Sequence, residues 1–394
     1  MKQIILLLLL LEGLSAANYT LKQLLETAGK HNDLSKALQQ EALSLKAKSR
    51  ADTATDPLAL YLEGTRAYPD GAKVGNEYAV GASKTFKFPS IREEELAMRQ
   101  LSNEANILEG QKSVLNFRNG LKNLYHQHCL DRQNYHVFRK SYDDFMKLYR
   151  KKQKAYMYQE ISRTELMQLE TEKNRLYAKL MSLDMEREMS RATLATLSGV
   201  SPQTGFSCRD VYPVRSRVSL PKTFALTKKA YEKRLKSTQK AIHRYSQGFD
   251  SVDLSAQYTN EIDVDRYTIG VSIPLNFGSE KYEQERASAM YQNSAIEHRL
   301  NQVLKEKRSQ LTRLKMMLKS QAFMIGTLTK NYTKYKKKVL PLVQRSYDLG
   351  ETSVIEFLLS KQKLYQLQEE IYQTKKAYYN TLFQLYSVSE KKDI

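Results

Sequence analysis

Three histidines and one cysteine form the cluster of side chains in this sequence whose types could bind a metal ion. His126, His128, Cys129 and His136 lie close together in the chain, and imidazole and thiolate groups are ligands for zinc and other transition metals. On a helix only His126 and Cys129 share a face, because residues three apart are neighbours on the helix surface. His128 points elsewhere, and His136 lies only roughly near Cys129. A coincidence explains the cluster better than a site, so we predict no metal.

Motifs of the common enzyme classes are missing from the sequence. There is no G-x-x-x-x-G-K phosphate loop, no G-x-S-x-G turn of a serine hydrolase and no H-E-x-x-H pair of a zinc peptidase. We therefore predict that the chain is not an enzyme and holds no cofactor. A disulfide needs ~6 Å between the two Cα atoms, and the sequence does not establish such a distance between Cys129 and Cys208. We therefore expect both cysteines to be free thiols.

The formal charge of +20 raises the question of a polyanionic partner. Lys and Arg that bind nucleic acid release counterions from phosphates, and they usually cluster for that purpose. Here they are spread along helical stretches with Glu between them, which is typical of a solvated charged face. We predict no nucleic-acid partner.

The first 17 residues have the pattern of a secretory signal. Lys2 precedes an apolar run from Ile4 to Leu11, and Ser15 and Ala17 stand before a cut ahead of Asn18. A buried helix or an anchor is the alternative, but the run is shorter than the ~20 residues that span a bilayer. No later segment is long and apolar enough for such a helix. We expect an exported protein that is periplasmic, secreted or inserted as a β-barrel.

Composition and periodicity predict a mainly α protein with a small β part. Eight Pro, 15 Gly and abundant Leu, Lys, Gln and Glu favour long helices. Apolar spacing near 3.5 residues along 279–345 predicts a coiled-coil-like seam on a helix of the order of 100 Å. The predicted helices are one or two within 18–52, then 90–198 with a break near 156–162, 222–248, 279–345 and 352–388. The predicted strands are 58–66, 77–88, 251–260 and 266–277.

Strict alternation marks the strands of the second half. Val252, Leu254, Ala256 and Tyr258 alternate with polar residues, so one strand face is apolar. Each run has about the ten residues that a tilted strand needs to cross a bilayer. An antiparallel strand over a soluble core would alternate in the same way.

The two halves of the chain repeat each other. Segment 81–90 matches 270–279, and the breaks match at four pairs of positions: Tyr156 and Tyr347, Ser162 and Ser353, Glu165 and Glu356, Leu176 and Leu367. We predict a first repeat at 18–199 with a hairpin at 58–88, a connector at 200–221, and a second repeat at 222–394 with a hairpin at 251–277. Four strands cannot close a barrel, so several copies must pool them, for instance three chains giving twelve strands.

Several segments resemble the TolC-type outer-membrane efflux protein family. They are Tyr347-Asp348-Leu349-Gly350-Glu351-Thr352-Ser353-Val354-Ile355-Glu356, Ser272-Ile273-Pro274-Leu275-Asn276-Phe277-Gly278 and Leu194-Ala195-Thr196-Leu197-Ser198-Gly199. The resemblance implies a homotrimer with a twelve-stranded transmembrane β-barrel in outer-membrane lipid and a long α-helical barrel in the periplasm. It implies an outer-membrane location and the function of exit duct in a tripartite efflux or type I secretion system. The implied partners are a periplasmic adaptor, or membrane fusion protein, and an inner-membrane pump.

The resemblance also implies site residues at the helix turns. Glu356 falls on the acidic position of the channel constriction, and Glu165 is its counterpart in the first repeat. Adaptor docking falls on the turns themselves, at Tyr347, Gly350, Ser353, Tyr156 and Ser162. The chain departs from the family pattern at Leu359, where a second acidic residue is expected, and at Gln159, where Gly is usual.

A soluble, elongated coiled-coil protein of the periplasm, an adaptor or a spacer, is the alternative function. It explains the helical seam and the signal but leaves the alternating hairpins and the matched breaks unexplained. The sequence does not indicate whether the cargo is a drug, a metal ion or a polypeptide.

Overall fold

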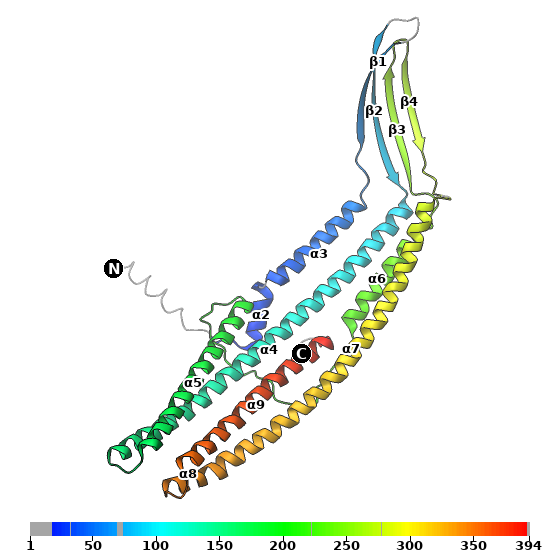
Figure 1. Ribbon diagram of the computed structural model, residues 1–394. Helices are drawn as coiled ribbons and strands as arrows, with labels where there is room; N and C mark the ends of the chain where they lie inside the picture. Colours follow the sequence, from blue (N-terminus) through cyan, green and yellow to red (C-terminus); the bar gives the residue numbers. More distant parts are fainter. Residues whose placement is uncertain (1–17, 32, 69–73, 222, 277, 392–394) are drawn as a thin grey trace, which may run out of the picture. The chain divides into compact units, whose positions relative to one another are not determined.

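The computed structural model describes residues 18–31, 33–68, 74–221, 223–276 and 278–391 (Figure 1). The predicted secretory signal at 1–17, the turn residues at 69–71 and Phe277 lie outside these residues. The chain divides into two compact units, each of which draws on both repeats. Unit 1 contains 1–36, 113–223 and 306–394, and unit 2 contains 37–112 and 224–305.

Helices dominate the described part of the chain, which confirms the mainly α prediction. They are α2 (Leu21–His31), α3 (Asp33–Asp52), α4 (Pro89–Met157), α5 (Arg163–Ser198), α6 (Ala225–Arg244), α7 (Glu280–Lys334), α8 (Leu340–Asp348) and α9 (Val354–Val388). Helix α4 alone has 69 residues. None of the helices within the described residues has the length and apolar character that crossing a membrane as a helix requires.

Unit 2 contains one antiparallel sheet of four strands in the order of the sequence. These are β1 (Ala59–Ala67), β2 (Gly75–Lys87), β3 (Ser251–Asn260) and β4 (Asp265–Ser272) (Figure 1). β1, β2 and β3 lie within two residues of the predicted strands, whereas β4 ends at Ser272, five residues before the predicted end at 277. β2 also pairs with β3, so the two hairpins, one from each repeat, form a single sheet.

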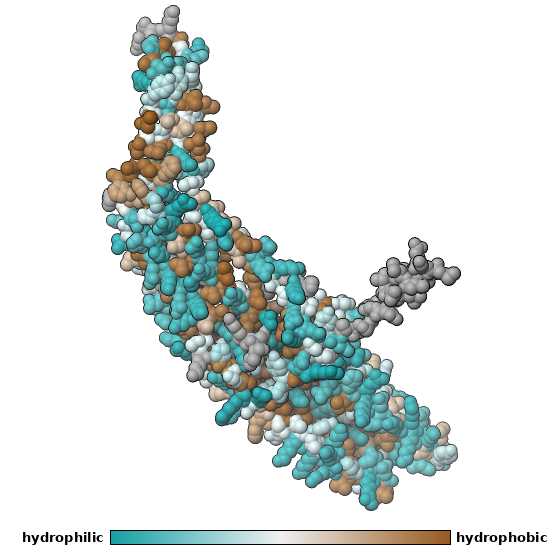
Figure 2. Space-filling model, turned by 180° about the vertical axis from the view of Figure 1, so that it is seen from behind, coloured by the Kyte–Doolittle hydropathy of each residue, from teal (hydrophilic) through white to brown (hydrophobic). Residues whose placement is uncertain are grey.

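The register brings the apolar residues of all four strands to one face. Leu62 pairs with Val80, Val80 with Tyr258, and Tyr258 with Tyr267. The next row in the same direction joins Leu60, Ala82, Ala256 and Ile269. This face is open to the surroundings in the single chain: Leu62 is 82% exposed and Ile269 is 86% exposed. Figure 2 shows hydrophobic side chains exposed on the strand region.

The opposite face of the sheet is polar and internally hydrogen-bonded. Tyr61 Oη donates to Gln257 Oε1 at 3.0 Å, and the hydroxyl of Thr85 donates to the carboxylate of Asp253. A Cβ added at Gly81 would collide with the Tyr61 ring, so glycine is required where this ring crosses the sheet. The sheet therefore has one exposed apolar surface and one polar surface, on which the Tyr61 ring covers Gly81.

Unit 1 buries its core between the helices. The stripe on α7 that the 3.5-residue spacing predicts is partly buried: Leu314, Leu318 and Ile325 are buried against aromatic residues of α9. Hydrogen bonds join α9 to two other helices of unit 1. Gln127 Nε2 of α4 donates to Lys376 O of α9 at 3.0 Å. Gln362 Nε2 of α9 donates to Glu172 Oε2 of α5 at 3.2 Å.

A short π-helical segment, Tyr335–Val339, separates α7 from α8. Its Leu340 N–H bonds to Tyr335 O, one residue further back than in an α-helix. Pro341 follows directly, and a proline ring clashes with the carbonyl four residues before it in a regular helix. The wider π turn accommodates that clash without ending the helical path. The interruption predicted near Pro341 is thus a change of helix type.

The expectation of two free thiols is wrong. Cys129 of α4 and Cys208 of the connector form a disulfide, with their Cα atoms 5.5 Å apart. Hydrogen bonds fasten the connector on both sides of the bridge. Arg132 Nη1 donates to Phe206 O at 2.7 Å, and Tyr379 Oη of α9 donates to Tyr212 O at 2.5 Å. The connector is therefore bound to α4 and α9, and a disulfide is typical of an oxidising compartment outside the cytoplasm.

Reduction of the disulfide should destabilise unit 1. The bridge closes a loop with a sequence separation of 79 residues, and removing such a constraint costs about 2 to 4 kcal/mol. We expect dithiothreitol to lower the melting temperature measured by circular dichroism. A Cys129→Ala/Cys208→Ala variant should melt at the lower temperature with or without the reductant. Two free thiols in the untreated native protein would contradict the pairing.

Candidate functional site

Two helix turns of unit 1, one from each repeat, share the same backbone geometry. The first joins α4 to α5 and the second joins α8 to α9. Gln159 (φ 63°) and Gly350 (φ 79°) take the left-handed conformation at equivalent positions. In both turns the following N–H reaches back five residues, from Glu160 to Ala155 O at 2.9 Å and from Glu351 to Ser346 O at 2.9 Å. This is the Schellman ending of a helix, and the structure confirms the predicted breaks.

A serine starts the next helix in each turn. Ser162 Oγ accepts from Glu165 N at 3.1 Å, and Ser353 Oγ accepts from Glu356 N at 3.2 Å. Glu356 completes a capping box, because its carboxylate accepts from Ser353 N at 3.3 Å. Ser162 and Ser353 thus have a structural role in capping α5 and α9.

The two tyrosines differ although they occupy matching positions. Tyr347 is buried, and its ring stacks on Phe357 with centroids 4.7 Å apart. Its Oη donates to Glu165 Oε1 at 2.6 Å, which joins the second turn to the first. Tyr156 is exposed. The pair of turns is therefore asymmetric in its side chains.

A lysine completes the contact between the turns. Lys152 Nζ lies 3.5 Å from Glu165 Oε1 and 4.3 Å from the centre of the Tyr347 ring. Burial and the hydrogen bond to Glu165 raise the pKa of Tyr347 above its ordinary value, so the hydroxyl remains protonated as a donor. We call Lys152, Glu165, Tyr347 and Phe357 the turn clasp.

The structure joins the two predicted turns through Glu165 and Tyr347, whereas Ser162 and Ser353 each contact only the glutamate of their own turn. Glu165 and Tyr347 meet in the turn clasp, whereas Glu356 is exposed with its carboxylate engaged in the cap of α9. Sequence reasoning missed Lys152 and Phe357. Lys152 could have been found from its position one helical turn before Tyr156, at the end of α4. No feature of the sequence indicates that Glu165 contacts Tyr347, which lies 182 positions away. A constriction formed by Glu165 and Glu356 stays a prediction.

The histidine cluster holds the connector in place. His126 Nε2 accepts from Tyr212 N at 2.9 Å, so Nδ1 carries the proton and donates to Lys122 O at 2.7 Å. Both ring nitrogens of His126 are therefore engaged in hydrogen bonds, and the sulfur of Cys129 is bound in the disulfide, so neither side chain is available to a metal ion. Burial lowers the pKa of His126 to about 4. Among the described residues, no group of three or more His, Cys, Asp or Glu side chains could hold a metal ion.

Removing the tyrosine hydroxyl should loosen the turn clasp. In a Tyr347→Phe variant Glu165 loses a charge-assisted hydrogen bond, which costs on the order of 1 to 3 kcal/mol. We expect faster amide hydrogen exchange at 158–165, measured by mass spectrometry. Tyr156→Phe is the matched control and should leave this exchange unchanged. Equal exchange in the two variants would exclude the clasp.

Acid should weaken the fastening of the connector through His126. Its folded pKa of about 4 lies below the ordinary value of about 6.5 for histidine, so the unfolded chain binds the extra proton and stability falls as pH decreases from about 6.5 to 4. The melting temperature of the wild-type protein should fall over this interval. A His126→Gln variant should start lower and lose less over the same interval. An identical pH slope in the two proteins would disprove the role of His126.

Comparison with protein-family models and with curated protein sequences finds no match. Comparison with solved structures finds several outer-membrane proteins. The chain is similar to the outer membrane protein VceC of Vibrio cholerae, with a TM-score of 0.73 and 15% identity over 94% of this chain and 96% of that chain. It is similar to the CmeC outer membrane channel of Campylobacter jejuni, with a TM-score of 0.74 and 13% identity over 95% and 87%.

The open state of the MtrE outer membrane channel of Neisseria gonorrhoeae is a third example, with a TM-score of 0.71 and 14% identity over 93% of this chain and 88% of that chain. At these identities the likeness shows the fold. It agrees with the helices, the four-stranded sheet and the paired turns described above. The chain therefore has the fold of the outer membrane protein VceC and of the outer membrane channels CmeC and MtrE, which is the TolC-type fold that its sequence resembles.

Proposed function

We propose that this protein is a channel of the outer membrane, a passive exit duct of a tripartite efflux or type I secretion system that extends into the periplasm. The observation that carries the proposal is the exposed apolar face of the four-stranded sheet. Tyr267, Ile269 and Val271 of β4 are all more than half exposed on that face. A row of large apolar side chains is unfavourable in water and favourable in lipid.

The edges of the sheet support an assembly of several copies. Among the residues that the structure describes, β1 and β4 are the outer strands, and each pairs with a single neighbouring strand. In lipid the free backbone groups of an edge strand cost several kcal/mol each. Strands shared among three chains would leave no edge, as the proposed homotrimer of twelve strands requires.

Exposed apolar residues at the helix turns support docking of a periplasmic adaptor. Met157 and Tyr158 are exposed at the first turn, and Leu349 and Ile355 are exposed at the second. Such groups on a helix end are suited to a protein partner. The adaptor would in turn connect to an inner-membrane pump, which would supply the energy for transport.

The turn clasp suggests how the inner end of the duct could be held. Glu165 is bound between Tyr347 and Lys152, while Glu356 stands exposed on the second turn. In the proposed trimer three copies of Glu356 would repel one another and attract cations. We propose Glu356 as the acidic ring of the constriction and Glu165 as the residue that holds neighbouring turns together.

Membrane fractionation of the natively expressed protein tests the proposal. We expect the protein in the outer-membrane fraction and a trimer when the detergent-extracted, unboiled particle is weighed. A soluble periplasmic monomer would disprove the channel and leave an elongated coiled-coil adaptor or spacer as the function.

A matched pair of strand variants sharpens this test. Ile269→Lys places a charge on the apolar face, at a cost of about 2 to 4 kcal/mol near the middle of a bilayer. Thr268→Lys places the same charge on the opposite face. We expect Ile269→Lys to reduce the trimer in the outer-membrane fraction and Thr268→Lys to preserve it. Equal yields would show that the apolar face does not contact lipid.

A further inference from the structure

A cavity of about 320 Å³ lies between α4, α7 and α9 in unit 1 (Figure 1). It is lined by residues within 130–137 of α4, within 329–336 of α7 and the π-helical segment, and within 368–375 of α9. In each range the lining residues recur every three or four positions, so each helix contributes one face. Neither the proposed channel nor the turn clasp uses these residues. We call this space the three-helix cavity.

One cation of the three-helix cavity, Lys375, has no counter-ion. None of the described residues that line the cavity carries a carboxylate. Burial lowers the pKa of Lys375 below its ordinary value, and no neighbouring charge opposes this effect. The next residue differs, because Lys376 Nζ lies 3.2 Å from Asp131 Oδ1. A half-buried ammonium without an opposite charge is unfavourable, so a bound anion would stabilise it.

A buried amide in the wall of the three-helix cavity has an unused donor. Asn134 of α4 is only 6% exposed, and its Oδ1 accepts from Gln368 Nε2 of α9 at 3.1 Å. Its Nδ2 has no acceptor among the described residues. A buried donor without an acceptor is unfavourable, because it has lost its hydrogen bonds to water. An oxygen atom of a ligand would therefore be favourable at this amide.

An apolar wall lies between the amide and the ammonium. Gln368, the partner of Asn134, precedes Lys375 by seven residues on α9, which is about 10 Å along a helix. Ile371 lies between them and lines the cavity together with Leu130 of α4. The volume is at the lower end of the range of small-molecule sites, which combine apolar walls with a few polar groups. The arrangement suits a ligand whose anionic group and neutral acceptor are joined by an apolar part.

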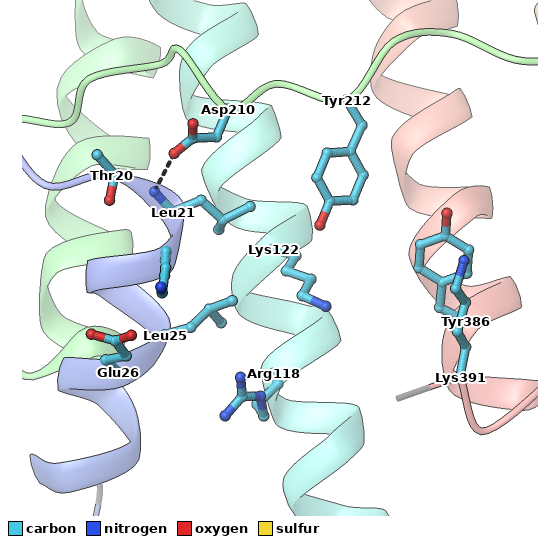
Figure 3. Close-up of a pocket in the computed structure, with 11 residues that line it drawn as sticks. Thr20, Leu21, Leu25, Glu26, Arg118, Lys122, Asp210, Tyr212, Tyr386 and Lys391 are labelled. Atoms are coloured by element: carbon cyan, nitrogen blue, oxygen red, sulfur yellow. Dashed lines mark hydrogen bonds between the residues drawn. The ribbon is translucent and has the colours of Figure 1, made fainter. Parts of the chain in front are cut away.

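A larger cavity of unit 1, of about 650 Å³, lacks such unused groups (Figure 3). It lies between the start of α2, α4, the connector and the end of α9. Asp210 caps the start of α2, and Lys391 Nζ donates to Ser219 O at 3.1 Å. Arg118 and Lys122 also have partners within the protein. These charged groups are engaged without a ligand, whereas Lys375 and Asn134 of the three-helix cavity are not.

We propose that the three-helix cavity binds a small organic carboxylate, with the carboxylate at Lys375 Nζ, a neutral oxygen acceptor at Asn134 Nδ2 and an apolar group between them. A single ammonium balances the single charge of a carboxylate. A doubly charged phosphate would need a second cation, but Lys336 Nζ lies 5.6 Å from the centre of the Tyr332 ring in a cation–π contact. The proposal goes beyond the channel function and does not depend on it, since every lining residue belongs to unit 1.

Fluorescence titration of the purified full-length protein in detergent tests the proposal, with the detergent alone as the blank. The probes are dansylglycine, which has a carboxylate, and its uncharged methyl ester. Both have an apolar ring system and sulfonyl oxygens as neutral acceptors. We expect saturable binding of dansylglycine above the blank and an affinity for the ester that is lower by about tenfold or more, because the ester has no charge to pair with Lys375. Absence of saturable binding, or equal affinity for the two probes, would overturn the proposal.

Variants locate the binding. Lys375→Gln should weaken the affinity for dansylglycine by about tenfold or more and abolish the preference over the ester. Asn134→Asp keeps the acceptor for Gln368 Nε2 but replaces the unused donor with a carboxylate oxygen, so it should weaken the binding of both probes. Lys363→Gln, at an exposed position of the same α9 outside the cavity, is the matched control and should bind like the wild type. Circular dichroism verifies that each variant is folded. Unchanged affinity for dansylglycine in folded Lys375→Gln and Asn134→Asp variants would contradict the assigned site.

Discussion

Backbone hydrogen bonding at the two outer strands is the constraint on which the rest of the structure depends. The backbone groups of the two inner strands are hydrogen-bonded on both sides, because the hairpins from the two halves of the chain pair through ten residue pairs between β2 and β3. β1 and β4 keep one open edge each, and the apolar side chains of all four strands share one face. A sheet of this kind is complete only when further strands cover its edges and an apolar medium covers its face. The duplication of the chain is one part of that solution, since a single hairpin would have left more of the backbone unpaired.

The parts of the fold that were predictable from sequence are those that local chemistry determines. Alternation with a period of two identified β3 at 251–260, which is its observed extent. Both helix turns were predicted from positions that match between the two halves, such as Ser162 and Ser353, and the structure shows that these serines cap the helices that follow. The 3.5-residue spacing of apolar residues predicted a buried seam on α7, and Leu314, Leu318 and Ile325 of that seam are buried.

Contacts between distant segments were not predictable. Cys129 and Cys208 are each unremarkable in sequence, and only the path of the connector across α4 brings them within bonding distance. The same holds for Glu165 and Tyr347, which belong to different repeats. The matched positions suggested equal roles for Glu165 and Glu356, yet one carboxylate bonds to a tyrosine of the other turn and the other caps its own helix.

The left-handed residue of each turn differs in its chemistry. Gly350 takes positive φ without steric cost, whereas Gln159 takes it against the preference of a residue with a side chain. The first turn therefore keeps its shape at a higher conformational energy than the second, and the turn clasp is the feature that joins the two. In a threefold ring the six turns would fall into two classes of three, one relaxed and one strained.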